Sequence, residues 1–167
     1  MFGFSRQRSL EWKTAGIITA IVSLPILIAV ATLIARDRWF PAGDMAQAEL
    51  HMRGFFAHPP LVGAAGRIVG DAGTQGSHPG PALWVAMLPV YLFGARSSDA
   101  LMLAVVSVHI VSILAAVMLA YRRGGRLLAA LTGLATLCFV RSSGTDFMIE
   151  PWNPWLALLP FMVFILL

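Results

Sequence analysis

The sequence predicts an all-α integral membrane protein, built as a multi-span bundle of apolar helices. Of its 167 residues, 58% are hydrophobic and only 12% are charged. A chain of this length cannot bury so much apolar surface around one aqueous core. The apolar residues are gathered into runs bounded by basic residues, which is typical of helices that cross a lipid bilayer. We expect about five hydrophobic segments, four of which span the membrane or start to span it.

The formal net charge of +4 at pH 7 indicates membrane topology rather than a nucleic-acid partner. The basic residues form short clusters at the ends of the apolar runs, where they favour the cytoplasmic side. Nucleic-acid binding is therefore not expected. The single cysteine, Cys138, lies inside an apolar stretch, so no disulfide framework exists and the cysteine count does not identify a compartment.

The first transmembrane helix is expected over residues 16–35, which cover about 30 Å at about 1.5 Å per residue. The preceding segment, residues 1–15, carries three basic side chains, at Arg6, Arg8 and Lys13. This charge places the amino terminus in the cytoplasm and the protein in the cell membrane. Ala29-Val30-Ala31 resembles a signal-peptidase site, so a cleaved signal peptide is the alternative. Because the apolar run continues past that point, we favour an uncleaved anchor.

Residues 36–99 are expected to form an extracytoplasmic loop that contains two juxtamembrane helices. Asp44 followed by Gln47 is typical of an N-cap with a reciprocal residue three places on, and predicts a helix over about 44–54. The segment 81–94 is apolar, but as a helix it covers only about 21 Å, too short to cross upright. We therefore expect it to lie at the interface. A spanning segment remains the alternative, and would put the next basic loop outside.

The second half of the chain continues the alternation of spans and loops. Residues 100–120 are long enough for a second transmembrane helix, and the three arginines in 121–126 then form a cytoplasmic turn. Residues 127–140 are expected to cross as a third helix, and 141–154 to return to the outer face. The last run, 155–167, is expected to start a fourth helix. A helix that stops in mid-bilayer leaves backbone groups unpaired, so we expect the chain to be part of a longer protein.

Short motifs follow one another in a particular order along the outer loop. Gly43-Asp44 opens its first helix, His58-Pro59-Pro60 follows, and Ser77-His78-Pro79-Gly80-Pro81 precedes the apolar LWVAMLPVYLFG segment. With the basic amino terminus and the single preceding span, this order resembles the start of the GT-C integral-membrane glycosyltransferases. It is closest to actinobacterial members, and more distantly similar to protein O-mannosyltransferases and lipid A aminoarabinose transferases.

The resemblance implies a GT-C-like fold, of which this chain would be the amino-terminal portion, about the first third of a typical member. It implies transfer of a sugar from a polyprenyl-phosphate donor to an acceptor hydroxyl on the outer face of the membrane. The implied partners are membrane lipids, the polyprenyl-phosphate sugar, a glycan or lipid acceptor, and the remaining helices of a longer chain or a partner subunit. No cofactor beyond the donor is implied, and neither the sugar nor the acceptor is identified.

The resemblance also implies roles for individual residues. Asp44 matches the acidic residue at the start of the first external loop that is the usual candidate for the base, since a carboxylate can accept the proton of an attacking hydroxyl. His78 is expected to contact the donor phosphate, with Arg53 as a weaker helper. Asp146 resembles a second acidic position of the family, and Glu150 lies close to it in sequence. We expect these two acids to support the substrate.

No metal site is predicted. The mannosyltransferases often carry two adjacent acids where this chain has Asp44-Met45, which weakens any inference of a metal or of mannose. His58 and His78 are separated by a distance in sequence that matches no common metal-ligand spacing.

Each of these residues also has an ordinary structural explanation. Asp44 can simply cap its helix, the histidines before prolines can be turn residues, and Asp146 and Glu150 can be solvated loop acids. His109 lies within the second span, where an intramembrane histidine can mark a proton path. Beside Ser107 and Ser112, we expect instead a packed, hydrogen-bonded side chain. The alternative function is therefore a non-catalytic multi-span membrane subunit or a transporter fragment.

Overall fold

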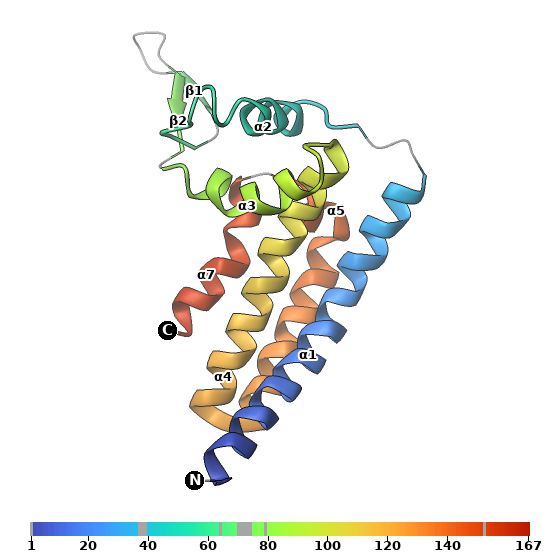
Figure 1. Cartoon of the computed structure of the whole chain (residues 1–167), viewed down its shortest axis with the longest axis vertical. Coiled ribbons are helices and arrows are strands. Elements are labelled where there is room, and N and C mark those ends of the chain that lie inside the picture. The colour runs from blue at the N-terminus through green and yellow to red at the C-terminus, as the bar shows by residue number, and fades with distance from the viewer. Residues whose placement is uncertain (1, 37–39, 64, 70–74, 79, 152) are drawn as a thin grey trace.

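A computed structural model describes residues 2–36, 40–63, 65–69, 75–78, 80–151 and 153–167. Most of this part is helical, which confirms the all-α class. The elements in chain order are α1 (Phe2–Ala35), α2 (Asp44–Arg53), β1 (Ala65–Val69), β2 (Gln75–Ser77), α3 (Ala82–Phe93), α4 (Ser98–Ser143), α5 (Thr145–Ile149), α6 (Asn153–Leu156) and α7 (Leu158–Ile165). Figure 1 shows α1 and the two halves of α4 as long rods, with α2, α3 and the strands gathered at one end of the bundle. We call this group of elements the cap.

Helix α1 is longer than the span expected over 16–35, because it begins at Phe2. Residues 4–15 contain no glycine or proline and include Arg, Gln, Glu and Lys, which are good helix formers. Nothing in this stretch therefore stops the helix before the apolar run starts. Within α1, Glu11 accepts a hydrogen bond from Arg122 Nε of α4, at the end of the bundle opposite the cap.

Helix α4 is a hairpin of two helices rather than one continuous rod. Gly124 (φ −141°, ψ 20°) and Gly125 (φ 65°, ψ −157°) leave the helical conformation, and the chain reverses direction there (Figure 1). The backbone conformation of Gly125 is open almost only to glycine, because a Cβ would clash with the backbone. The glycine pair therefore makes a turn within the range 121–126 that the sequence predicted.

Two clusters of buried residues hold the fold together. The first joins α1 to both halves of α4. Within this contact, a Cβ added to Gly133 would lie 2.3 Å from Ile18 Cγ2. A glycine therefore lets α4 approach α1 closely, as small residues do between membrane helices. The second cluster joins the cap to the start of α4, and its buried members are Ala48, Met52, Trp84, Met87, Tyr91, Ala100, Leu101, Ala104, Val105 and Leu156.

The outer surface of the bundle is apolar. Ile17, Ile21, Leu24 and Ile28 of α1 are each more than half exposed. By length and composition, two helical stretches could cross a membrane, Arg8–Ala35 and Ser98–Ser143. The core helix of a water-soluble protein or a signal sequence can also satisfy that test. Large exposed apolar surfaces are typical of proteins that meet a membrane or a partner, so these helices indicate membrane association.

The cap contains one feature that the sequence did not predict. Strands β1 and β2 pair antiparallel, with Ala65 opposite Ser77 and Val69 opposite Gln75. Helix α3 has 12 residues and lies across the end of the bundle rather than along it (Figure 1).

Candidate functional site

Helix α2 begins at Asp44, but Asp44 is its first helical residue and not its N-cap. The N-cap is Gly43, with φ 56°, and the Gly43 carbonyl accepts a hydrogen bond from the Gln47 N–H at 3.1 Å. The predicted capping role of Asp44 is therefore wrong, because the left-handed turn into the helix selects glycine at the capping position. The Asp44 side chain is exposed and lies in the first turn, where the helix dipole favours a negative charge.

Arg53, at the other end of α2, is held by a carboxylate that the sequence analysis did not include. Glu49 is only 4% exposed, and its Oε1 accepts hydrogen bonds from Arg53 Nε at 3.0 Å and from Nη2 at 2.6 Å. This hydrogen bond and the charge of Glu49 raise the pKa of Arg53. The arginine is therefore a fixed cation whose charge is partly neutralised. The four-residue spacing of Glu49 and Arg53 on a helix was the available signal.

Glu49 also connects α2 to the start of α4. Its two carboxylate oxygens accept hydrogen bonds from Ser98 Oγ, at 3.1 Å and 2.9 Å. Ser98 is 49 residues away in sequence, so no local pattern could have predicted this contact. The contact fixes the position of α2 relative to the membrane-length helix α4.

The turn between α3 and α4 is unusually constrained. Ala95 and Arg96 both have left-handed backbones, with φ of 56° and 57°. Tyr91 Oη donates a hydrogen bond to the Arg96 carbonyl at 3.1 Å, and burial raises the pKa of this phenol. Ser97 caps α4 by accepting a hydrogen bond from the Ala100 N–H. These contacts hold Ser98, and through it Glu49, in place.

His51, Trp84 and the segment around Val62 form a second group in the cap. The Trp84 side chain is buried, and its Nε1–H donates a hydrogen bond to the Val62 carbonyl at 3.1 Å. The ring of His51 stacks on the indole, with 5.3 Å between ring centroids and an interplanar angle of 6°. The sequence analysis did not select His51, because a histidine in the middle of a short helix carries no recognisable motif.

His78 joins the same group through its backbone. The Gly63 N–H, next to Val62, donates a hydrogen bond to the His78 carbonyl at 2.8 Å. A Cβ on Gly63 would lie 3.0 Å from both the Cβ and the carbonyl oxygen of His78, so only glycine fits here without displacing its neighbours. Trp84 therefore orders the segment against which His78 packs. The structure brings His78 and His51 to the same part of the cap.

The two remaining predicted residues follow the α4 hairpin. Asp146 lies in α5, which is at the cap end of the bundle (Figure 1), but its side chain is outside the described residues. Glu150 follows α5 and is half-buried. The roles of both acids stay predictions.

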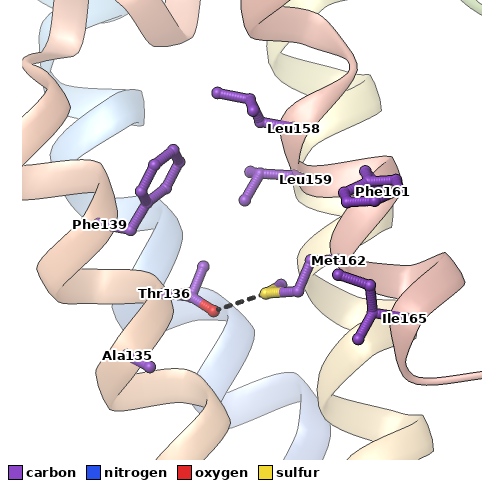
Figure 2. Close-up of a pocket in the computed structure, with 8 residues that line it drawn as sticks. All are labelled: Ala135, Thr136, Phe139, Leu158, Leu159, Phe161, Met162 and Ile165. Atoms are coloured by element: carbon purple, nitrogen blue, oxygen red, sulfur yellow. Dashed lines mark hydrogen bonds between the residues drawn. The ribbon is translucent and has the colours of Figure 1, made fainter.

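An apolar groove of about 250 Å³ lies between the second half of α4 and α7. Figure 2 shows its lining, in which the Thr136 hydroxyl lies 3.5 Å from Met162 Sδ. This hydroxyl also donates to the Thr132 carbonyl, so the groove offers no free polar group from Thr136. The lining residues are Ala135, Thr136, Phe139, Leu158, Leu159, Phe161, Met162 and Ile165.

His109 departs from its prediction in one respect. It is packed, with no exposed surface, but within the described part of the chain neither ring nitrogen has a hydrogen-bond partner. The expected hydrogen bond to the neighbouring serines does not form; their hydroxyls donate instead to backbone carbonyls, Ser107 to Ala104 and Ser112 to Val108. Serine hydroxyls in helices often bond to the preceding turn in this way.

The fold and the cap together define a class, a helical protein with two helices of membrane-spanning length and a polar cap at one end of the bundle. Comparison with known proteins adds no family to this description, because no protein-family model, curated protein or solved structure matches the chain. Across the described residues, no group of three or more His, Cys, Asp or Glu side chains is placed to hold a metal ion.

Proposed function

We propose that the protein is a membrane glycosyltransferase, which transfers a sugar from a polyprenyl-phosphate donor to an acceptor hydroxyl on the outer face of the cell membrane. The observation that carries the proposal is the cap, where an exposed carboxylate and an exposed helical surface lie at one end of an apolar bundle. A substrate whose tail is dissolved in the bilayer presents its phosphate and sugar at this level. The order of motifs around Asp44 and His78 supports the same class.

Each group would have a distinct part in the transfer. Asp44 accepts the proton of the acceptor hydroxyl while the hydroxyl oxygen forms a bond to the anomeric carbon of the sugar. The bond from that carbon to the phosphate oxygen breaks, and its electron pair stays on the phosphate. His78 and Arg53 contact this phosphate, whose negative charge grows as the bond breaks. Asp146 and Glu150 orient the sugar or the acceptor.

The distribution of charge supports an orientation with the cap outside. Arg8 and Lys13 of α1 lie toward one end of the bundle, together with the three arginines that flank the glycine turn of α4. The cap lies at the opposite end (Figure 1). The segments 36–99 and 141–154 also carry six basic residues, but these are spread over longer loops together with seven acids. Because arginines concentrated in a short turn favour the cytoplasmic side, the cap would face the extracytoplasmic compartment.

Asp44→Asn tests the proposal, since the amide keeps the size of the side chain but cannot accept the proton. We expect transfer from a polyprenyl-phosphate sugar by the reconstituted full-length protein to fall by about 100-fold or more, with normal membrane insertion. The matched control is Asp99→Asn, which removes an exposed acid in the first turn of α4 and should leave transfer unchanged. Equal transfer by the wild type and the Asp44→Asn variant would contradict the role of Asp44.

His109 favours a second candidate, a transporter in which a polar pathway crosses the bundle. The Glu11–Arg122 contact places these two residues at the same height along the bundle, so it serves as a reference point on both α1 and α4. At about 1.5 Å per residue, Ser23 lies about 18 Å and His109 about 20 Å from that level, so both stand at the same depth. Both are buried without a hydrogen-bond partner among the described residues. Loss of ion-coupled uptake in a His109→Ala variant, with transfer absent in the wild type, would favour this candidate.

A further inference from the structure

His51 has a defined ring orientation that its sequence context does not reveal. Its Nδ1 lies 2.8 Å from the carbonyl oxygen of Gln47. A carbonyl oxygen can only accept a hydrogen bond, so Nδ1 must carry the proton. The other ring nitrogen, Nε2, is then the atom that can accept or donate without disturbing the position of the ring. His51 as a residue is exposed to solvent, which a ligand contact at Nε2 requires.

The surroundings of His51 keep this orientation fixed. One face of the imidazole lies on the indole of Trp84, which is 1% exposed and therefore part of the core of the cap. Trp84 is in turn held by its hydrogen bond to the Val62 carbonyl. The stacking on Trp84 and the hydrogen bond from Nδ1 to Gln47 together restrict both rotations of the His51 side chain. A preorganised ring loses little entropy when a ligand binds.

The position of His51 on α2 relates it to Asp44. They are seven positions apart, about two helical turns, which puts both side chains on one face of the helix, about 10 Å apart along the axis. Both are exposed. The acceptor hydroxyl would lie about 2.8 Å from the base, and the donor phosphate about 2.8 Å from its ligand. With the hydroxyl oxygen about 3 Å from the anomeric carbon, the distance from base to phosphate ligand is similar to this separation. If a base acts at the Asp44 end, the departing phosphate lies toward His51.

We propose that His51 is a further binding residue, which contacts the phosphate of the polyprenyl-phosphate donor through Nε2. The inference rests on the proposed function and deepens it. The protonated ring donates Nε2–H to a phosphate oxygen, and Nδ1 stays bonded to Gln47. The backbone of His78 contacts Gly63, next to the Val62 carbonyl that holds Trp84, so the segment that carries His78 adjoins the same part of the cap.

The first test is His51→Asn, in which the shorter amide can still donate to the Gln47 carbonyl but nothing replaces Nε2. Because the substitution removes a hydrogen bond to a charged group, we expect kcat/KM for the polyprenyl-phosphate sugar to fall by about 10- to 100-fold. The matched control is His58→Asn, an exposed histidine in the same loop, which should change kcat/KM by less than about twofold. Unchanged kcat/KM in His51→Asn would overturn the inference.

The second test does not depend on activity. The full-length protein, labelled with ¹⁵N-histidine in lipid nanodiscs, is titrated with undecaprenyl phosphate and separately with undecaprenol. We expect the Nε2 resonance of His51 to shift with the phosphate only, while Nδ1 keeps its proton. A shift with undecaprenol as well, or no shift with the phosphate, would overturn the inference.

The two tests separate the failure of this inference from that of the proposed function. Transfer that depends on Asp44, together with an unresponsive His51, would leave the enzyme assignment standing and remove His51 from the site. A phosphate-specific shift at His51 in a protein that transfers no sugar would have the opposite meaning. His51 would then be a phosphate contact in a lipid-binding protein that is not a transferase.

Discussion

The close approach of α1 and α4 at Gly133 predicts that Gly133→Ala destabilises the wild-type protein but stabilises a variant in which Ile18 is shortened to alanine. In the wild type, a Cβ at position 133 would lie 2.3 Å from Ile18 Cγ2. Ile18 is β-branched and therefore stiff at χ1 in a helix, so it cannot swing aside easily. Gly133→Ala should consequently force the two helices apart or push Ile18 out of its rotamer.

Two opposing terms determine the magnitude. Overpacking of this kind costs about 1–3 kcal/mol. Replacing a helical glycine by alanine gains up to about 1 kcal/mol through helix propensity. We therefore expect Gly133→Ala to lower the free energy of unfolding by about 1 kcal/mol. In an Ile18→Ala background the overpacking disappears, and the same substitution should raise the free energy of unfolding by about 0.5–1 kcal/mol.

The measurement is reversible unfolding of the purified protein in mixed micelles, followed by circular dichroism as a denaturing detergent is titrated. The control is Gly16→Ala in α1, where an added Cβ would meet nothing within 4 Å. This substitution should stabilise the protein in both backgrounds, because only the propensity term acts. If Gly133→Ala shifts stability equally in the wild type and in the Ile18→Ala background, the helices do not touch at this point and the reasoning is refuted.

Two further predictions concern the contacts that hold the cap. Ser98→Ala removes the hydroxyl that donates to Glu49 and should lower the free energy of unfolding by about 2 kcal/mol. The control is Ser142→Ala, whose hydroxyl donates to the Phe139 carbonyl of its own helix, and which should change the free energy of unfolding by less than about 0.5 kcal/mol. Equal effects of the two substitutions would contradict the α2–α4 contact. Burial raises the pKa of Tyr91 above the ordinary value of 10.0, so its neutral form contributes stability that is present below that pH and lost as pH rises through the folded-state pKa. Tyr91→Phe should therefore reduce the loss of stability measured above pH 10. Near neutral pH it should lower the free energy of unfolding by about 1 kcal/mol, because the hydrogen bond to the Arg96 carbonyl is lost. If the free energy of unfolding falls with pH above 10 as steeply in the variant as in the wild type, the role of burial is contradicted.

Local sequence patterns were sufficient for the two helices of the cap and for the turn in α4, but not for α5, which lies within the loop expected over 141–154. Helix α2 covers Asp44–Arg53 and α3 covers Ala82–Phe93, against expected ranges of 44–54 and 81–94. The glycine pair within the arginine cluster produced the reversal in α4. These features depend on neighbours in sequence, such as capping residues, helix-compatible runs and turn glycines. The pairing of β1 with β2 was missed, because the strands have 5 and 3 residues and show no clear alternation of apolar and polar side chains.

The candidate site was less predictable, because its contacts join residues that are distant in sequence. The position of Asp44 at the start of α2 followed from the sequence, but the clamp between Glu49 and Ser98 did not. His51 carries no motif, and its orientation depends on Trp84, which lies on a different helix. The pattern of residues showed only which ionisable side chains the loop contains. Only the packing of α2 on α3 and α4 shows which of these side chains are held in place.

The burial of Glu49 explains why α2 presents the face that it does. The ion pair adds little net stability, since Arg53 is exposed to water that screens the attraction and the buried Glu49 carboxylate has lost hydration. The Glu49 carboxylate is nevertheless satisfied by Arg53 and Ser98 in only one rotation of α2 about its axis. On a helix with about 3.6 residues per turn, Asp44 and His51 lie roughly opposite Glu49. The contact that faces the bundle therefore turns the candidate base and the candidate phosphate ligand outward together.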